Sequence, residues 1–65
     1  MGAAIRNTRI KRGITQEGLA LLAEVDRSYV GRVERGDNNV AVLTLLKIAQ
    51  ALDVSIRDLM KEAKL

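Results

Sequence analysis

Three residues, Glu24 to Asp26, are all that separates two helix-forming segments of this 65-residue chain. The segments are "TQEGLALLA" before the break and "RSYVGRVE" after it, and both are rich in residues that favour helices. So short a connection forces the two helices to cross steeply, which is the geometry of a helix-turn-helix. The chain is therefore expected to hold this motif at its centre.

The rest of the chain also has the composition of helices, and strand-like alternation is brief wherever it occurs. We predict an all-α fold of five short helices, at about residues 3–12, 16–23, 27–35, 42–52 and 56–63. The boundaries come from stop and cap residues, with Gly13 and Gly36 ending the first and third helices. Expected N-caps are Thr15, Asp26 and Ser55, the last with Asp58 at the favourable third position.

Helical spacing also indicates which side chains face the core. In the first helix Ile5, Arg9 and Ile10 can share an inward stripe. The fourth helix offers a longer apolar stripe, made of Leu45, Leu46, Ile48, Ala49 and Leu52. No proline, linker or repeat divides the chain, so residues 1–65 are expected to form a single domain.

The composition excludes several chemistries. The chain contains no cysteine and no histidine, which leaves no disulfide, thiol nucleophile or usual metal ligand set. It has no phosphate-binding glycine loop, nucleophile elbow or metal-ligand spacing, and no run of about 18 apolar residues. We therefore expect a cytoplasmic protein that is not an enzyme, with no metal, no cofactor, no membrane contact and no effector pocket that we recognise.

The net charge of +3 is unevenly distributed. Residues 1–36 carry seven Lys/Arg against four Asp/Glu, whereas residues 37–65 carry four of each. A basic half beside a neutral half suggests a surface that faces a polyanion, and nucleic acid is the commonest such partner.

The third helix concentrates this charge on one side. At about 100° per residue, five polar or small residues of this helix fall within one arc of its circumference: Arg27, Ser28, Gly31, Arg32 and Arg35. Val30 and Val33 fall opposite the arc, with Tyr29 and Glu34 at its margins. The helix therefore has one side for the core and another for a partner.

A merely solvated face is the alternative interpretation of this arc, and three features weigh against it. Such faces usually mix charges of both signs, but the centre of this one is entirely positive. Gly31 costs about 0.5 to 1 kcal/mol relative to alanine in a helix interior, which close approach to another surface would explain. Arginine can also bond two acceptors at once on a guanine edge or a phosphate. Contact with DNA is the favoured interpretation.

The central segment "ITQEGLALLAEVDRSYVGRVERGDNNVAVLTLLKIAQALDVS" resembles the helix-turn-helix domain of phage repressors and Xre-type bacterial regulators. Within that family it is most similar to the small controller proteins of restriction-modification systems. The most specific parts are "TQE.LA", "DRSYV..VERG" and "L.KIA.ALDVS". The resemblance covers essentially the whole chain and implies a compact lambda-repressor-like fold and a sequence-specific DNA-binding transcriptional regulator.

The resemblance implies a role for each matching residue. Base-reading positions correspond to Arg27, Ser28 and Arg32. DNA-backbone positions correspond to Thr15, Gln16, Tyr29, Arg35, Asn38 and Asn39. Arg9 and Glu34 match a pair that forms a salt bridge between the first and third helices, so they are assigned to the scaffold.

Three residues depart from the family pattern. Gly18 leaves the capping box of Thr15 incomplete, and Ala41 replaces the usual Ser/Thr cap of the fourth helix. Glu24 stands where glycine or asparagine is common, which is strained if that residue adopts positive φ. These departures predict lower stability rather than a different function.

The chain has more apolar residues than so small a core can hide: Leu21, Leu22, Val40, Val42, Leu43, Leu59, Met60 and Leu65. Some of them can form a subunit interface, and we expect a homodimer through the fourth and fifth helices that binds a palindromic operator. A protein-interaction module of the same fold, of the antitoxin or anti-repressor type, is the alternative function.

Overall fold

The computed structural model describes residues 1–37 and 40–63, and in this part of the chain it contains five α-helices. The helices are α1 (Gly2–Lys11), α2 (Gln16–Ala23), α3 (Arg27–Glu34), α4 (Val42–Ala51) and α5 (Ile56–Glu62). The prediction of an all-α, five-helix fold is confirmed, with each boundary within about one residue of the expected one.

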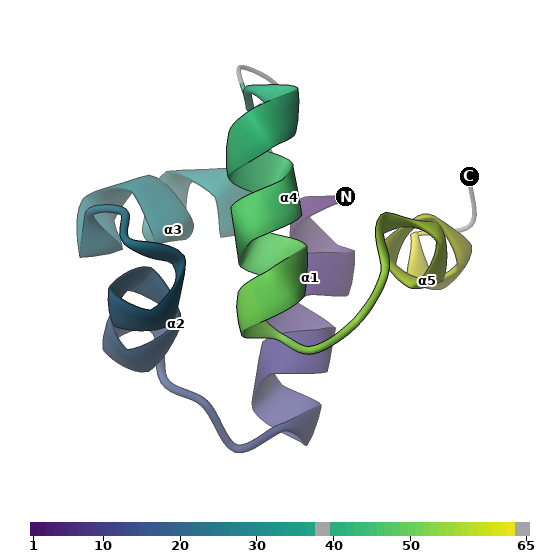
Figure 1. Cartoon of the computed structure of the whole chain (residues 1–65), viewed down its shortest axis with the longest axis horizontal. Coiled ribbons are helices and arrows are strands. Elements are labelled where there is room, and N and C mark those ends of the chain that lie inside the picture. Colours follow the sequence, from purple (N-terminus) through teal and green to yellow (C-terminus); the bar gives the residue numbers. More distant parts are fainter. Residues whose placement is uncertain (38–39, 64–65) are drawn as a thin grey trace.

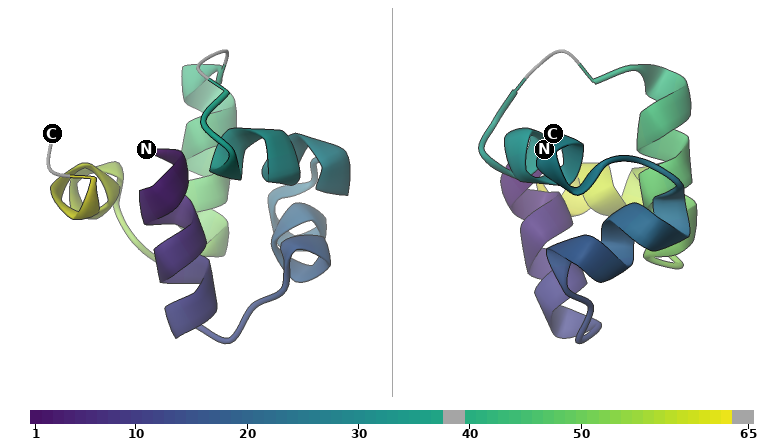
Figure 2. Two further views of the ribbon diagram at one scale, coloured as in Figure 1. Left: turned by 180° about the vertical axis from the view of Figure 1, so that it is seen from behind. Right: turned by 90° about the vertical axis from the view of Figure 1, so that its left-hand side faces the viewer.

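In Figure 1, α4 stands at the centre of the view with α1 behind it. The side view in Figure 2 shows that α4 lies along one face of the molecule. The α2 and α3 helices lie on one side of α4, and α5 lies on the other side, next to α1 (Figure 2). The short connection between α2 and α3 makes them cross steeply, as the sequence predicts.

All five helices contribute to one core. Its largest fully buried side chains are Ile5, Leu19, Val30, Ile48, Leu52 and Leu59. Leu59 was expected among the surplus apolar residues, so that expectation is wrong: its side chain faces inward from α5. Ile10 and Leu46 were expected inside, but both are exposed because each lies beyond the edge of its helix's buried stripe.

The first four helices end with the same backbone conformation and the same kind of backbone hydrogen bond. In each case one residue adopts positive φ and the next N–H reaches back to a carbonyl five residues earlier, as Ile14 does to Arg9 (3.1 Å) and Val25 to Ala20 (3.0 Å). Gly13 and Gly36 provide that conformation freely. Glu24 (φ 59°) and Asp53 (φ 58°) adopt it at a cost, so the strain expected at Glu24 is present.

The N-terminal ends of the helices differ in quality. Thr15 accepts a hydrogen bond from the Gly18 N–H (2.9 Å), and Ser55 forms a complete capping box with Asp58. Asp26 occupies the N-cap of α3, but its side chain makes no capping hydrogen bond, so the expectation of a side-chain cap there is wrong. Ala41 begins α4 without a side-chain cap, as expected from its methyl group.

The start of α1 packs directly on the end of α3. A Cβ atom added at Gly2 would overlap the carbonyl oxygen of Val33 and lie 2.9 Å from that of Glu34. At Gly31, by contrast, an added Cβ would meet the flexible end of the Arg35 side chain, at 3.1 Å.

These two glycines therefore make a matched pair. Gly2→Ala is expected to destabilise the fold by about 1 to 3 kcal/mol, because backbone carbonyls cannot move aside without shifting α1. Gly31→Ala should leave stability unchanged or raise it by up to about 1 kcal/mol, because alanine favours the helix and the Arg35 side chain can move. Thermal unfolding followed by circular dichroism measures both; equal effects would contradict the close packing of α1 on α3.

Candidate nucleic-acid interface

The outward side of α3 carries the basic arc in the arrangement that the sequence predicts. Val30 and Val33 are buried against the core. Arg27, Arg32 and the C-cap residue Arg35 are exposed on the other side. Because the two valines anchor one side of the helix, the orientation of the arginines is fixed by packing.

A shallow hollow of about 360 Å³ lies along this side of α3. Its lining residues are Gln16, Arg27, Ser28, Gly31, Arg32 and Arg35. The structure thus brings the three predicted base-reading residues together with two of the predicted backbone-contacting ones. Three guanidinium groups around one concave surface favour an anionic partner that presents hydrogen-bond acceptors.

Gly31 forms the floor of this hollow, and it is covered. Although it lies at the centre of the outward arc, Gly31 is buried, and the Arg35 guanidinium lies over it. The free space that the glycine provides is therefore occupied by the Arg35 side chain in this structure, which differs from the expectation that a partner would fill it.

Tyr29 is half-buried at the margin of the arc and packs against the core. The Arg32 guanidinium lies over its ring, 5.7 Å from the centroid. A cation over an aromatic face is attracted by the ring quadrupole. Tyr29 therefore offers Arg32 a favourable surface. The sequence did not predict this contact, although the two residues are three apart on one helix.

An ion pair joins α1 to α3. The Arg9 Nε donates to Glu34 Oε2 (2.7 Å) and its Nη2 to Glu34 Oε1 (3.1 Å), so the pair is bidentate. The Arg9 Nη1 also donates to the Ile14 carbonyl (2.9 Å) in the turn that follows α1. The Glu34 side chain is 2% exposed and that of Arg9 is 11% exposed, so the two charges are largely removed from water.

A third residue completes this group. The Gln16 Nε2 donates to Glu34 Oε1 (3.1 Å), which links the start of α2 to the end of α3. The sequence predicts a DNA-contacting role for Gln16 and a scaffold role for Glu34, but not the bond between them. Their separation of 18 residues gives no periodic signal, so the contact depends on how α2 and α3 cross.

Two further contacts modify the predicted site. The Thr15 hydroxyl oxygen accepts its capping bond, which leaves the hydroxyl proton available to another acceptor. The Arg27 Nε lies 3.9 Å from Glu17 Oε1, and both side chains are well exposed. An exposed pair at this distance contributes little to stability, so Arg27 can exchange Glu17 for another anion.

The two asparagines predicted to contact the DNA backbone, Asn38 and Asn39, lie outside the described residues.

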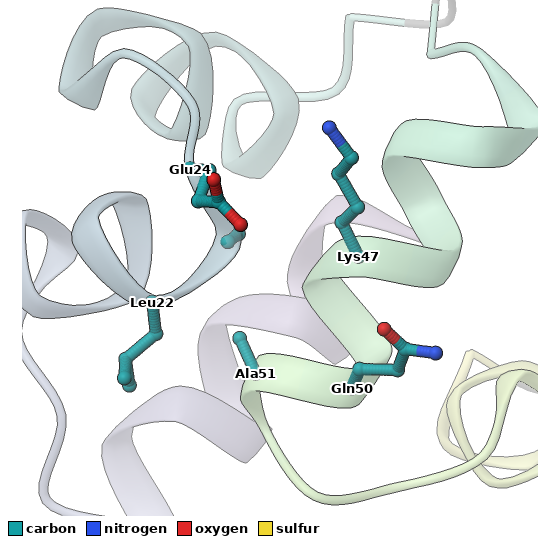
Figure 3. Close-up of a pocket in the computed structure, with 6 residues that line it drawn as sticks. Leu22, Glu24, Lys47, Gln50 and Ala51 are labelled. Atoms are coloured by element: carbon teal, nitrogen blue, oxygen red, sulfur yellow. The ribbon is translucent and has the colours of Figure 1, made fainter.

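A second hollow, of about 290 Å³, lies between α2 and α4 (Figure 3). Its lining mixes Leu22 and Ala51 with one acid, Glu24, one base, Lys47, and Gln50. Since its charges are of opposite sign, this hollow does not share the uniformly basic character of the surface along α3.

The described residues lack two other kinds of feature. No helix there is long and apolar enough to cross a membrane. No group of three or more His, Cys, Asp or Glu side chains in the same residues could hold a metal ion.

Comparison with known proteins identifies the family and agrees with the fold. Residues 5–59 match the protein-family model described as "Helix-turn-helix". The chain is 38% identical over 56 residues to control protein C.SmaI of Serratia marcescens, covering 86% of this chain and 67% of that protein. It is 37% identical over 60 residues to control protein C.BamHI of Bacillus amyloliquefaciens, covering 91% and 74% of the two chains.

The fold is also similar to a solved structure, that of the restriction-modification controller protein C.AhdI from Aeromonas hydrophila. The two share 50% sequence identity with a TM-score of 0.86, over 89% of this chain and 88% of the other. The resemblance to phage-repressor-like regulators, and among them to controller proteins, is confirmed.

The Arg9–Glu34 pair makes a direct stability test possible. Arg9→Met removes the guanidinium but keeps much of its length, and it leaves the Glu34 carboxylate buried with Gln16 as its remaining side-chain donor. Breaking a buried pair in this way costs about 3 to 5 kcal/mol, which is a large share of the free energy of unfolding of a small domain. Urea unfolding measures the loss.

Lys11→Met is the matched control for this test. The Lys11 Nζ lies 3.7 Å from Glu62 Oε1 with the lysine side chain 71% exposed, so its removal should change stability by less than about 1 kcal/mol. Similar losses from the two variants would show that the Arg9–Glu34 pair does not hold α1 to α3.

Proposed function

The chain belongs to the helix-turn-helix family, and we propose that it is a transcriptional regulator that binds a palindromic operator in double-stranded DNA as a homodimer. The observation that carries this proposal is the hollow along α3, in which three arginines and a serine face outward from a helix anchored by two buried valines. An α-helix fits the major groove, where arginine can bond the guanine edge with two hydrogen bonds. The proposal contains no catalytic step.

The residues of this surface have two roles, reading bases and holding phosphates. Arg27, Ser28 and Arg32, which line the hollow, read base edges. Thr15, Tyr29 and Arg35 hold phosphates, with the Thr15 hydroxyl proton and the Tyr29 hydroxyl as donors. Asn38 and Asn39 keep their proposed backbone contacts on the basis of the family resemblance.

A dimer accounts for a second feature, the exposed apolar residues of α4 and α5. Val42, Leu43 and Leu46 form one stripe on α4, and Met60 is exposed on α5. Val42 and Leu43 are 71% and 74% exposed. Burial of this stripe against a second copy would remove apolar surface from water and present two copies of α3 to half-sites about 34 Å apart.

The interaction-module alternative is not favoured, because the chain is similar to controller proteins in both sequence and structure. Antitoxin-like or anti-repressor-like binding would also leave the uniformly basic hollow on α3 without a role.

Base reading by Arg32 can be tested on an operator enriched from random duplexes. Arg32→Ala is expected to weaken operator binding by about 1 to 3 kcal/mol and to relax the preference at one base pair of each half-site. Lys11→Ala, on α1, should leave the sequence preference unchanged. Fluorescence anisotropy on operator and random duplexes at one salt concentration gives both ratios. An equal loss on the two duplexes would make Arg32 a phosphate contact.

The dimer can be tested with two exposed leucines. Leu43→Glu places a charge in the proposed α4 interface and should shift the protein from dimer to a monomer of about 7.1 kDa. Leu21→Glu, at a position on α2 that is 82% exposed, should leave it dimeric. Size-exclusion chromatography with light scattering at tens of micromolar distinguishes the two. A monomeric wild-type chain at that concentration would overturn the dimer.

A further inference from the structure

The amide of Gln16 has one orientation that its surroundings permit. Its Nε2 lies 3.1 Å from Glu34 Oε1. An ionised carboxylate accepts hydrogen bonds and donates none, so the NH₂ group of the amide must face Glu34. The Glu34 carboxylate is itself fixed by two bonds from Arg9 and is 2% exposed.

This arrangement leaves a defined set of groups on Gln16. One N–H is used by Glu34, and the carbonyl oxygen Oε1 and the second N–H remain. Gln16 lines the hollow along α3 together with Arg27 and Ser28, and it also lines the adjoining hollow at the start of α2. The remaining acceptor and donor therefore belong to a side chain at the interface.

A phosphate makes poor use of this pair of groups. Phosphate oxygens accept hydrogen bonds but donate none, so a phosphate would use only the second N–H and leave the Gln16 carbonyl to water. In the major groove, adenine presents the complementary pair, a donor at N6 and an acceptor at N7, which a glutamine amide can bond together. The guanidinium groups of Arg27, Arg32 and Arg35 carry only donors, and so they cannot accept from an adenine amino group.

We propose that Gln16 reads an adenine in each half-site, with its amide held in the reading orientation by Glu34. This inference rests on the proposed DNA-binding function and replaces the phosphate contact first expected for Gln16. Gln16 adds to the arginine donors of α3 a hydrogen-bond acceptor that comes from α2.

The test uses the 65-residue chain and the operator enriched by the wild-type protein. Gln16→Met keeps the length of the side chain but removes its hydrogen bonds. It is expected to weaken operator binding about 5- to 150-fold, to relax the preference for adenine at one position of each half-site, and to leave affinity for random duplex unchanged. Gln50→Met is the matched control: Gln50 is an exposed glutamine in the hollow between α2 and α4, and its loss should change neither affinity.

Modified bases identify the contact. Replacing that adenine by 7-deazaadenine removes the N7 acceptor, and replacing it by purine removes the N6 amino group. Each replacement should weaken binding of the wild-type protein, whereas Gln16→Met should bind the modified and normal operators equally. Circular dichroism at the assay temperature checks that both variants are folded.

Two results would overturn the inference while leaving the proposed function intact. Equal losses of Gln16→Met on operator and random duplex would return Gln16 to the phosphates. An unchanged adenine preference in that variant would remove it from base reading. Failure of the wild-type protein to enrich any sequence would instead contradict the proposed function.

Discussion

The carboxylate of Glu34 is the point at which the first three helices are joined. It accepts two hydrogen bonds from Arg9 of α1 and one from Gln16 of α2, and it belongs to the last residue of α3. Burying a charge is costly unless it is paired and hydrogen-bonded, so this carboxylate strongly favours the arrangement in which all three donors are present. The carboxylate therefore adds a polar link to the apolar packing of Val30 and Val33 that holds α3 in place.

Glu34 lies close along the chain to two arginines of the basic surface. Arg35 directly follows Glu34, and its guanidinium folds back over Gly31. One turn earlier, Arg32 lies over the ring of Tyr29, which packs on the core. Arg35 therefore begins next to a buried ion pair along the chain, and Arg32 is supported by an aromatic ring. Such support lowers the entropy that is lost when this side chain binds a partner.

The elements of the fold were predictable because their signals are local. Gly13, Thr15 and Ser55 mark helix ends through backbone conformation and capping, and the spacing of Val30 and Val33 identifies the buried side of α3. Burial at the edges of the stripes was less predictable. Ile10 is exposed and Leu59 is buried, because the neighbouring helix, rather than the helix itself, determines how wide the covered stripe is.

The candidate site divides in the same way. The outward arc of α3 followed from periodicity, and the Arg9–Glu34 pair followed from the family resemblance rather than from any local pattern. The bond between Gln16 and Glu34 and the position of Arg35 over Gly31 could not be foreseen, since both depend on side chains brought together by the crossing of helices or by a rotamer. Asp26 shows the reverse error, a contact that was predicted and is absent: aspartate is a good N-cap residue, but its side chain makes no capping hydrogen bond here.

Selection of bound duplexes from a random library by the wild-type protein tests the central claim most directly, because one experiment reports on the basic surface and on the dimer together. We predict a palindromic consensus with guanine in each half-site and half-site centres about one helical turn, or about 34 Å, apart. A library that shows no enrichment at moderate salt, or a consensus without two-fold symmetry, would contradict this claim.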